Sequence, residues 1–138
     1  MKRLIFIFIL SFGLFSCKTN SSDQKNESGT DSGKKAKFEF TEDVHDFGDI
    51  VEGEKVSCSF KFKNVGEADL IISNAKASCG CTAPTYTKEP IAPGEEGKID
   101  VTFDSSNKSG NQYKKITITA NSDPEIQELV VTCNILKK

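Results

Sequence analysis

The sequence predicts an all-β protein, a sandwich of about seven antiparallel strands, and three observations support this prediction. Apolar and polar residues alternate with a period of two through most of the chain beyond residue 36. Turn-forming residues separate these stretches at short intervals, and no stretch carries the apolar stripe of an amphipathic helix. This combination is typical of an immunoglobulin-like sandwich, although without the tryptophan of an antibody-type core. A small barrel is the alternative.

Each predicted strand follows from its own alternation. Phe38 and Phe40 alternate with charged residues at the start of the series. Residues 55–64 (KVSCSFKFKN) alternate most clearly, because every second residue from Val56 to Phe62 is apolar and the others are serine or lysine. Four further strands are predicted at 69–75 (DLIISNA), 98–104 (KIDVTFD), 114–121 (KKITITAN) and 127–136 (QELVVTCNIL). The inward-facing residues of the last three are expected to be Ile99, Val101 and Phe103, then Ile116, Ile118 and Ala120, then Leu129, Val131, Cys133 and Ile135.

The first residues have the composition of a secretory signal. Residues 1–3 are a basic start, residues 4–15 are almost wholly apolar, and Ser16 is a small residue before Cys17. The apolar run is shorter than the roughly 20 residues that a transmembrane helix needs. LFSC resembles a bacterial lipobox, which predicts a signal peptide at 1–16 and a Cys17 modified with fatty-acyl chains such as palmitate. An ordinary secreted protein or a signal anchor is the alternative.

Residues 17–36 are expected to be the lipidated cysteine and a flexible tether, and residues 37–138 one domain. Positions 18–35 contain no aliphatic or aromatic residue, so they cannot bury enough apolar surface to become ordered. A flexible chain of this length reaches roughly 20–25 Å on average. We therefore expect a lipid-anchored protein of the bacterial cell envelope, preferentially the outer membrane, with its domain in the periplasm or at the cell surface.

The charge of the chain argues against a nucleic-acid partner. The net charge is −2, and removing the leader, which holds Lys2 and Arg3 and no acid, makes it −4. Nucleic-acid binding requires clustered lysine and arginine, which this chain lacks.

Three stretches carry a resemblance to a known family: HDFGDIVEGE at 45–54, FKNVGEADLIISNAKASCGCTAP at 62–84 and IAPGEEGKIDVTFD at 91–104. They resemble the bacterial family called domain of unknown function 1573, which is similar to the Hydin-type branch of immunoglobulin-like domains. The resemblance covers about residues 44–136 and rests on the SCGCT core and the following PGE turn. It implies a seven-stranded sandwich, often at the end of a lipoprotein, and it implies no activity.

Apart from Cys17 the chain has four cysteines, and two of them lie on predicted strands. Cys58 and Cys133 both face inward by alternation, and in an up-and-down sandwich both lie near the pole that points away from the tether. The favoured interpretation is that they are small buried apolar residues. The alternative is an inter-sheet disulfide, which requires Cα atoms within about 7 Å.

The other two cysteines, Cys79 and Cys81, flank Gly80 in the stretch SCGCTAP, between a strand and a turn. A structural turn or a disulfide across Gly80 is the favoured interpretation, since an oxidising compartment permits disulfides. A redox-active disulfide is a second interpretation. Binding of Cu(I) or Zn is a third, and it would need the chain's one histidine, His45, or the other cysteines as further ligands.

No catalytic constellation is recognisable. The chain lacks a G-x-S-x-G elbow and a phosphate-binding glycine loop, and one histidine leaves little for a Ser-His-Asp site. Asp46 and Asp49 flank Gly48 and could bind a cation, but turn capping is favoured. Glu95-Glu96 and the acids at 52–54 are expected in solvated turns. No cofactor and no resident metal are predicted.

Two functional hypotheses follow. The first is a non-catalytic, lipid-anchored immunoglobulin-like module that presents loops or sheet faces to a protein or glycan of the cell envelope. The second is a thiol redox or soft-metal-handling protein that uses the Cys79-Gly80-Cys81 turn. Enzyme activity is expected only in the second case, as thiol exchange.

Overall fold

The computed structural model describes residues 33–137 of the 138-residue chain. The expected signal peptide at 1–16, Cys17 and most of the expected tether lie outside the described residues. Within the described part the chain forms eight strands and no helix, so this part contains no helix able to cross a membrane. The strands are β1 (Phe38–Phe40), β2 (Val44–Val51), β3 (Lys55–Asn64), β4 (Ile72–Ala77), β5 (Thr82–Tyr86), β6 (Glu96–Asp104), β7 (Gly110–Ala120) and β8 (Ile126–Leu136).

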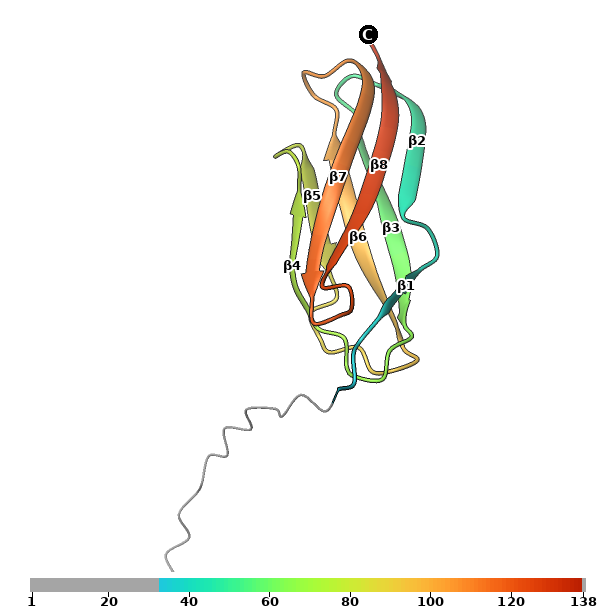
Figure 1. Cartoon of the computed structure of the whole chain (residues 1–138). Coiled ribbons are helices and arrows are strands. Elements are labelled where there is room, and N and C mark those ends of the chain that lie inside the picture. The colour runs from blue at the N-terminus through green and yellow to red at the C-terminus, as the bar shows by residue number, and fades with distance from the viewer. Residues whose placement is uncertain (1–32, 138) are drawn as a thin grey trace, which may run out of the picture. The chain divides into compact units, whose positions relative to one another are not determined.

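The strands form two four-stranded sheets that pack face to face (Figure 1). One sheet has the order β1-β3-β6-β5 and the other the order β2-β8-β7-β4. Two separate sheets confirm the predicted immunoglobulin-like sandwich and exclude the barrel alternative. The strands number eight, one more than the predicted seven.

The first two strands belong to different sheets, so the start of the domain is divided between them. β1 pairs antiparallel with β3, and Phe38 lies opposite Asn64. After residues 41–43 the chain joins the other sheet, where β2 pairs with β8 in parallel and Val44 lies opposite Val130. Among the named strands of residues 33–137 the other pairings are antiparallel, and an isolated bridge between Ala36 and Ser122 is also parallel.

A strand replaces the turn that was expected after the cysteine pair. Residues Thr82–Tyr86 form β5, which pairs antiparallel with β6, and Pro84 lies opposite Val101. β5 is the edge strand of its sheet. Proline has no backbone N–H to donate. It is tolerated in an edge strand because a position that faces away from the neighbouring strand makes no inter-strand hydrogen bond. The prediction of a turn directly after the cysteine pair was therefore wrong.

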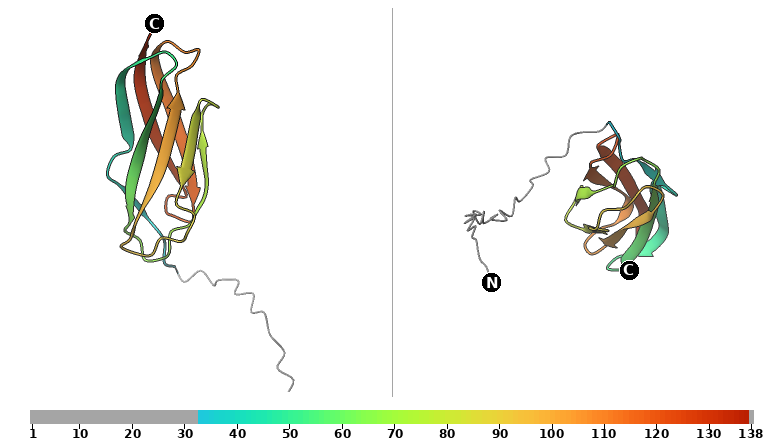
Figure 2. Two further views of the ribbon diagram at one scale, coloured as in Figure 1. Left: turned by 180° about the vertical axis from the view of Figure 1, so that it is seen from behind. Right: turned by 90° about the horizontal axis from the view of Figure 1, so that it is seen from below.

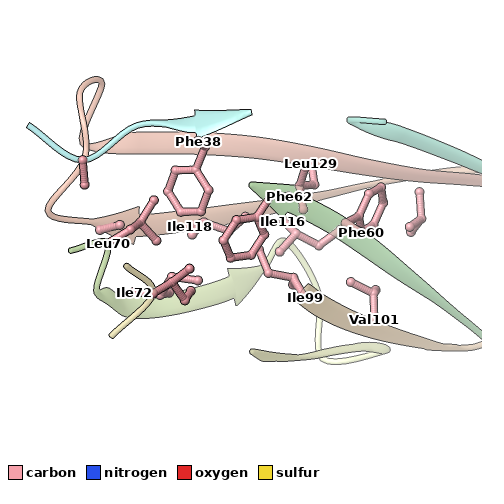
Figure 3. Close-up of a cluster of buried hydrophobic side chains, with 14 residues drawn as sticks. Phe38, Phe60, Phe62, Leu70, Ile72, Ile99, Val101, Ile116, Ile118 and Leu129 are labelled. Atoms are coloured by element: carbon pink, nitrogen blue, oxygen red, sulfur yellow. The ribbon is translucent and has the colours of Figure 1, made fainter. Parts of the chain in front are cut away.

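The core lies between the sheets and follows the predicted alternation. All ten residues predicted to face inward in β6, β7 and β8 are buried. The larger cluster includes Phe60 and Phe62 from β3, and Figure 3 shows their rings among branched side chains from both sheets. Full burial of one such side chain contributes about 1.5–3 kcal/mol relative to exposure. The smaller cluster consists of Ile50, Phe103, Cys133 and Ile135.

We call the end of the sandwich at which the described chain begins the proximal pole (Figure 2). Close packing at this pole requires a glycine at position 66. Ala36, assigned to the end of the expected tether, is fully buried, and its carbonyl accepts a hydrogen bond from Asp123 N at 2.9 Å. A Cβ on Gly66 would lie 2.6 Å from Ala36 Cα and 2.5 Å from Lys37 N. Real Cβ atoms do not approach so closely, so only glycine fits beneath this segment.

A buried asparagine joins the loops of the proximal pole. The Asn64 side chain is 0% exposed. Its Nδ2 donates to Ala68 O and to Ile91 O, both at 2.8 Å. Its Oδ1 accepts from Gly66 N at 3.0 Å and from Lys37 N at 3.3 Å. The amide thus uses its full hydrogen-bonding capacity to satisfy backbone groups from three segments.

Candidate functional site

The candidate site is the turn Ser78–Thr82, which joins β4 of one sheet to β5 of the other. It lies toward the distal pole, the end at which β8 ends (Figure 1). Ser78 N donates to Lys115 O at 2.9 Å, and Lys115 N donates to Ser78 Oγ at 3.3 Å. Asp104 N donates to Cys81 O at 2.9 Å. The turn is therefore fixed to β7 at one end and to β6 at the other.

A disulfide closes this turn. Cys79 and Cys81 are bonded across Gly80, with their Cα atoms 5.3 Å apart, and both side chains are half-buried. The hydroxyl of buried Thr82 lies 3.5 Å from Cys79 Sγ and 4.0 Å from Cys81 Sγ. This geometry is that of a disulfide, which both the structural and the redox-active interpretation of the pair allow. Neither sulfur is a thiolate while the bond is intact, so metal binding would require prior reduction.

Cys58 and Cys133 remain free thiols, so the inter-sheet disulfide considered from the sequence does not form in the structure. Cys133 is buried in the smaller cluster, against which half-buried Cys81 also packs. Burial raises the pKa of the Cys133 thiol. Burial, and then the charges of Glu42 and Asp100, raise the pKa of Cys58 to about 11. Both groups are therefore thiols at neutral pH and poor nucleophiles.

His45 is packed rather than poised for ligation. Its Nδ1 lies 3.1 Å from Glu42 Oε1. Its ring meets Phe47 edge-on at a centroid distance of 4.8 Å and approaches Phe60 at 6.4 Å. Among residues 33–137 no group of three or more histidine, cysteine or acidic side chains could hold a metal ion.

Asp46 and Asp49 lie in a β-bulge within β2 rather than in a turn between strands. Asp46 Oδ1 accepts a hydrogen bond from Gly48 N at 3.0 Å. This bond is the main cause of the lowered pKa of Asp46, and a hydrogen bond from the Thr132 side chain is the second cause. Asp49 Oδ1 accepts from Asn134 Nδ2 at 2.8 Å. The register of β2 against β8 shifts between the two aspartates. The predicted capping bond is thus present, but in a different structural setting.

The remaining acids occupy turns or exposed strand ends. Glu54 accepts a hydrogen bond from Val51 N at 2.9 Å in the turn after β2. Glu95 lies in the turn before β6, and Glu96 is exposed where β6 begins.

Sequence reasoning missed the side chains that surround the two aspartates. A groove of about 360 Å³ lies over β2, β8 and the start of β7. It is lined by Asp46, Gly48, Asp49, Asn111, Gln112, Thr132, Cys133 and Asn134. Three strands contribute to it, and only their register brings the residues together, so no local sequence signal identifies the groove.

The two facing sheets and the divided first strand define an immunoglobulin-like β-sandwich domain. Residues 38–135 match the family described as protein of unknown function (DUF1573), and the chain belongs to this family. The match confirms the resemblance seen in the sequence. A comparison with curated proteins gives no match.

Several solved structures have a similar fold. A protein of unknown function from Porphyromonas gingivalis W83 aligns over 79% of this chain, with 16% identity and a TM-score of 0.66. The PapD-like domain 7 of human CEP192 aligns over 86% of this chain and 97% of its own length, with 11% identity and a TM-score of 0.61. The secreted serine protease VesC of Vibrio cholerae aligns over 72% of this chain, with 15% identity and a TM-score of 0.57.

These likenesses show the fold alone, because the identities are low. The chain spans about half, 51%, of the Porphyromonas gingivalis chain and 23% of VesC.

Proposed function

We propose that this protein is a lipid-anchored, non-catalytic immunoglobulin-like module of the bacterial cell envelope that mediates an interaction with a protein or glycan. The observation that carries the proposal is the state of the reactive side chains in residues 33–137. Two sulfurs form a disulfide, two cysteines are protonated thiols, and His45 is packed against Phe47 and bonded to Glu42. In this state none of the four sulfurs is a thiolate nucleophile.

The end of the domain at which the chain enters also supports this proposal. The chain joins the sandwich at the proximal pole, through residues 33–37 (Figure 2). A tether from a lipidated Cys17 would therefore reach the domain at this pole. The distal pole and the outer faces of both sheets would stay accessible on a rigid scaffold, as an interaction module requires.

The anchor is tested by metabolic labelling with an alkynyl palmitate analogue. We expect the full chain to incorporate the label and to sediment with membranes, and the Cys17→Ser variant to lose the label. Equal labelling of the variant, or an unlabelled wild-type chain, would remove the anchor from the proposal.

The interaction role is tested against the thiol redox alternative. Full-length wild type and the variant Cys79→Ser/Cys81→Ser are each used to capture partners from envelope membranes after cross-linking. We expect the same partner in equal yield with both chains, and no turnover of glutathione disulfide by either. Turnover that depends on Cys79 and Cys81 would favour the redox alternative, and failure of both chains to capture any partner would contradict the proposal.

A further inference from the structure

We propose that the outer face of β2, β8 and β7 binds a neutral oligosaccharide. This inference rests on the interaction role proposed above and specifies the chemistry of the partner. It follows from a β-bulge, from the register of three strands and from the side chains that this register brings together.

The bulge turns two carboxylates toward the same face. In a regular strand, residues three apart point to opposite faces. Asp46 nevertheless lies opposite Thr132 and Asp49 opposite Asn134, because the register shifts between them. Gly48 adopts a φ of +67° within the bulge, a conformation that favours glycine. Bulges are known to re-aim side chains in this way.

Strand register extends these two positions into a grid across three strands. Thr132 and Asn134 face outward, because the residues between and beside them in β8 are buried. Tyr113 of β7 lies opposite Thr132, and Asn111 lies opposite Asn134. The two rows of the grid are Asp46, Thr132 and Tyr113, and Asp49, Asn134 and Asn111. Neighbouring strands are about 4.8 Å apart, so each row extends over roughly 10 Å.

The side chains of this grid complement sugar hydroxyl groups. Carboxylates only accept hydrogen bonds, whereas amides and hydroxyls both donate and accept, and each sugar hydroxyl also does both. Asp49 already accepts from Asn134, which orients both groups. The side chains of Asn111 and Tyr113 form no hydrogen bond with any of residues 33–137, so their polar atoms remain available to a ligand. Five of the six grid residues help to line the groove of about 360 Å³, a volume at the lower end of the range for small-molecule sites, about 300–1,000 Å³.

An exposed aromatic residue, Tyr113, lies opposite the groove residue Thr132 in the strand register, although it does not itself line the groove. Tyr113 is 64% exposed, more than any other exposed large apolar side chain among the described residues. Tyrosine offers an apolar face beside a polar tip, and such residues are enriched where a protein contacts a partner. The apolar C–H face of a pyranose ring can pack on such a ring while its hydroxyls reach the neighbouring carboxylates and amides.

The charge of the face selects among ligands. Asp46 and Asp49 give the grid two negative charges. The nearby Lys115 is paired with Glu128 at 3.0 Å, and Lys114, whose charge acts on Cys133, leaves the local charge negative. A phosphorylated or otherwise anionic ligand would be repelled. Two carboxylates alone are too few for a metal ion, and residues 33–137 contain no larger ligand cluster. A neutral, hydroxyl-rich ligand satisfies the donors and acceptors without a charge conflict.

The test is a nuclear magnetic resonance titration of the full chain in phosphocholine-type micelles. Maltohexaose, cellohexaose and chitohexaose are added separately, and calcium chloride and tetralysine are added in parallel samples. We expect at least one hexasaccharide to shift the backbone amide of Thr132 and the side-chain amides of Asn111 and Asn134. Tyr113→Ala should weaken this binding at least tenfold. Ile126→Ala removes a 56% exposed apolar side chain from the other end of the same face and should change it less than twofold.

Several results would overturn this inference. Two of them are the absence of shifts with all three sugars and sugar binding that survives Tyr113→Ala. The others are a response to calcium alone and a response to tetralysine alone. The last would indicate that the face binds a basic protein segment instead. If no sugar binds but the capture experiment recovers a partner, only the sugar inference fails. If the capture experiment also recovers no partner, the proposed function fails as well.

Discussion

The two poles of the sandwich are stabilised by different chemistry. At the proximal pole, the buried amide of Asn64 joins backbone groups of three segments, and Gly66 lets two of them approach closely. At the distal pole, a short disulfide fixes a half-exposed turn over an apolar cluster that contains the free thiol of Cys133. The comparison indicates that the proximal pole depends on particular side chains, whereas the distal turn depends on a covalent bond. Substitutions should therefore have larger effects at the proximal pole.

The largest effect is expected from Asn64→Ala. This change removes the side-chain partner of two backbone carbonyls and two backbone N–H groups. Ile91 O keeps its hydrogen bond from Leu70 N, whereas each buried group that is left unpaired costs about 1–3 kcal/mol. Because some of these groups will regain water, we expect the free energy of unfolding in urea to fall by about 3–5 kcal/mol. Asn74→Ala, on an exposed position of β4, is the control and should change it by less than about 0.5 kcal/mol. A loss below about 1 kcal/mol for Asn64→Ala would show that the pole does not depend on this amide.

A pair of glycine substitutions compares the poles directly. Gly66→Ala introduces a Cβ against backbone atoms of residues 35–37, which cannot swing away, so we expect a loss of about 2–3 kcal/mol in the same assay. Gly80→Ala, in the distal turn, adds a Cβ that meets nothing within 4 Å. It should change stability by less than about 0.5 kcal/mol. Similar losses for both variants would mean that the two poles do not differ in this respect.

Loss of the disulfide should have a smaller effect. In the chain-entropy account, a cross-link that closes so short a loop contributes only about 1–2 kcal/mol. We therefore expect Cys79→Ser/Cys81→Ser to remain folded and to lose about that much stability relative to wild type with its disulfide intact, measured by urea unfolding without reductant. Wild type unfolded with a reductant is the control and should lose a similar amount. A variant that fails to fold would show that the distal turn is as demanding as the proximal pole.

The smallest effect concerns pH. The pKa of Cys58 is raised from 9.0 to about 11 in the folded protein, first by burial. Between these values the unfolded chain loses the proton that the folded chain keeps, so stability is complete below pH 9 and falls as the pH rises to 11. Because Cys58 is only half-buried, solvent screening reduces the expected loss to about 1 kcal/mol. Unfolding at pH 8.5 and pH 11 should differ by this much more in wild type than in Cys58→Ser, and an equal pH response would contradict the assignment.

Much of the fold could be predicted because alternation reports which side of a strand faces the core. This worked in β3, β6, β7 and β8, where residues such as Phe60, Val101 and Leu129 are buried as expected. It could not show that the first strand divides between two sheets, since β1 and β2 both alternate and only tertiary pairing distinguishes them. Nor could it show the burial of Asn64, because asparagine at a strand end is ordinarily a sign of a turn.

The candidate site was partly predictable for a similar reason. The stretch SCGCT can be recognised from neighbouring residues alone, and Cys79 and Cys81 form a disulfide in the structure. Whether Cys58 and Cys133 form a disulfide depends on the distance between them across the sandwich. Alternation shows only that both side chains face inward, and it does not give that distance. The outer-face grid depends on the register of three strands and on one bulge. Such features become visible only when the strands are assembled.

The divided first strand also gives the domain a mechanical property. The described chain begins at one pole and ends at the other, and β2 runs parallel to β8 over six paired positions (Figure 1). A force that pulls residue 33 and residue 137 apart draws these two strands in opposite directions along their length. The hydrogen bonds between them are then loaded together in shear, instead of breaking one after another as in a zipper. A domain built in this way resists tension between its two poles, because six paired positions must separate together.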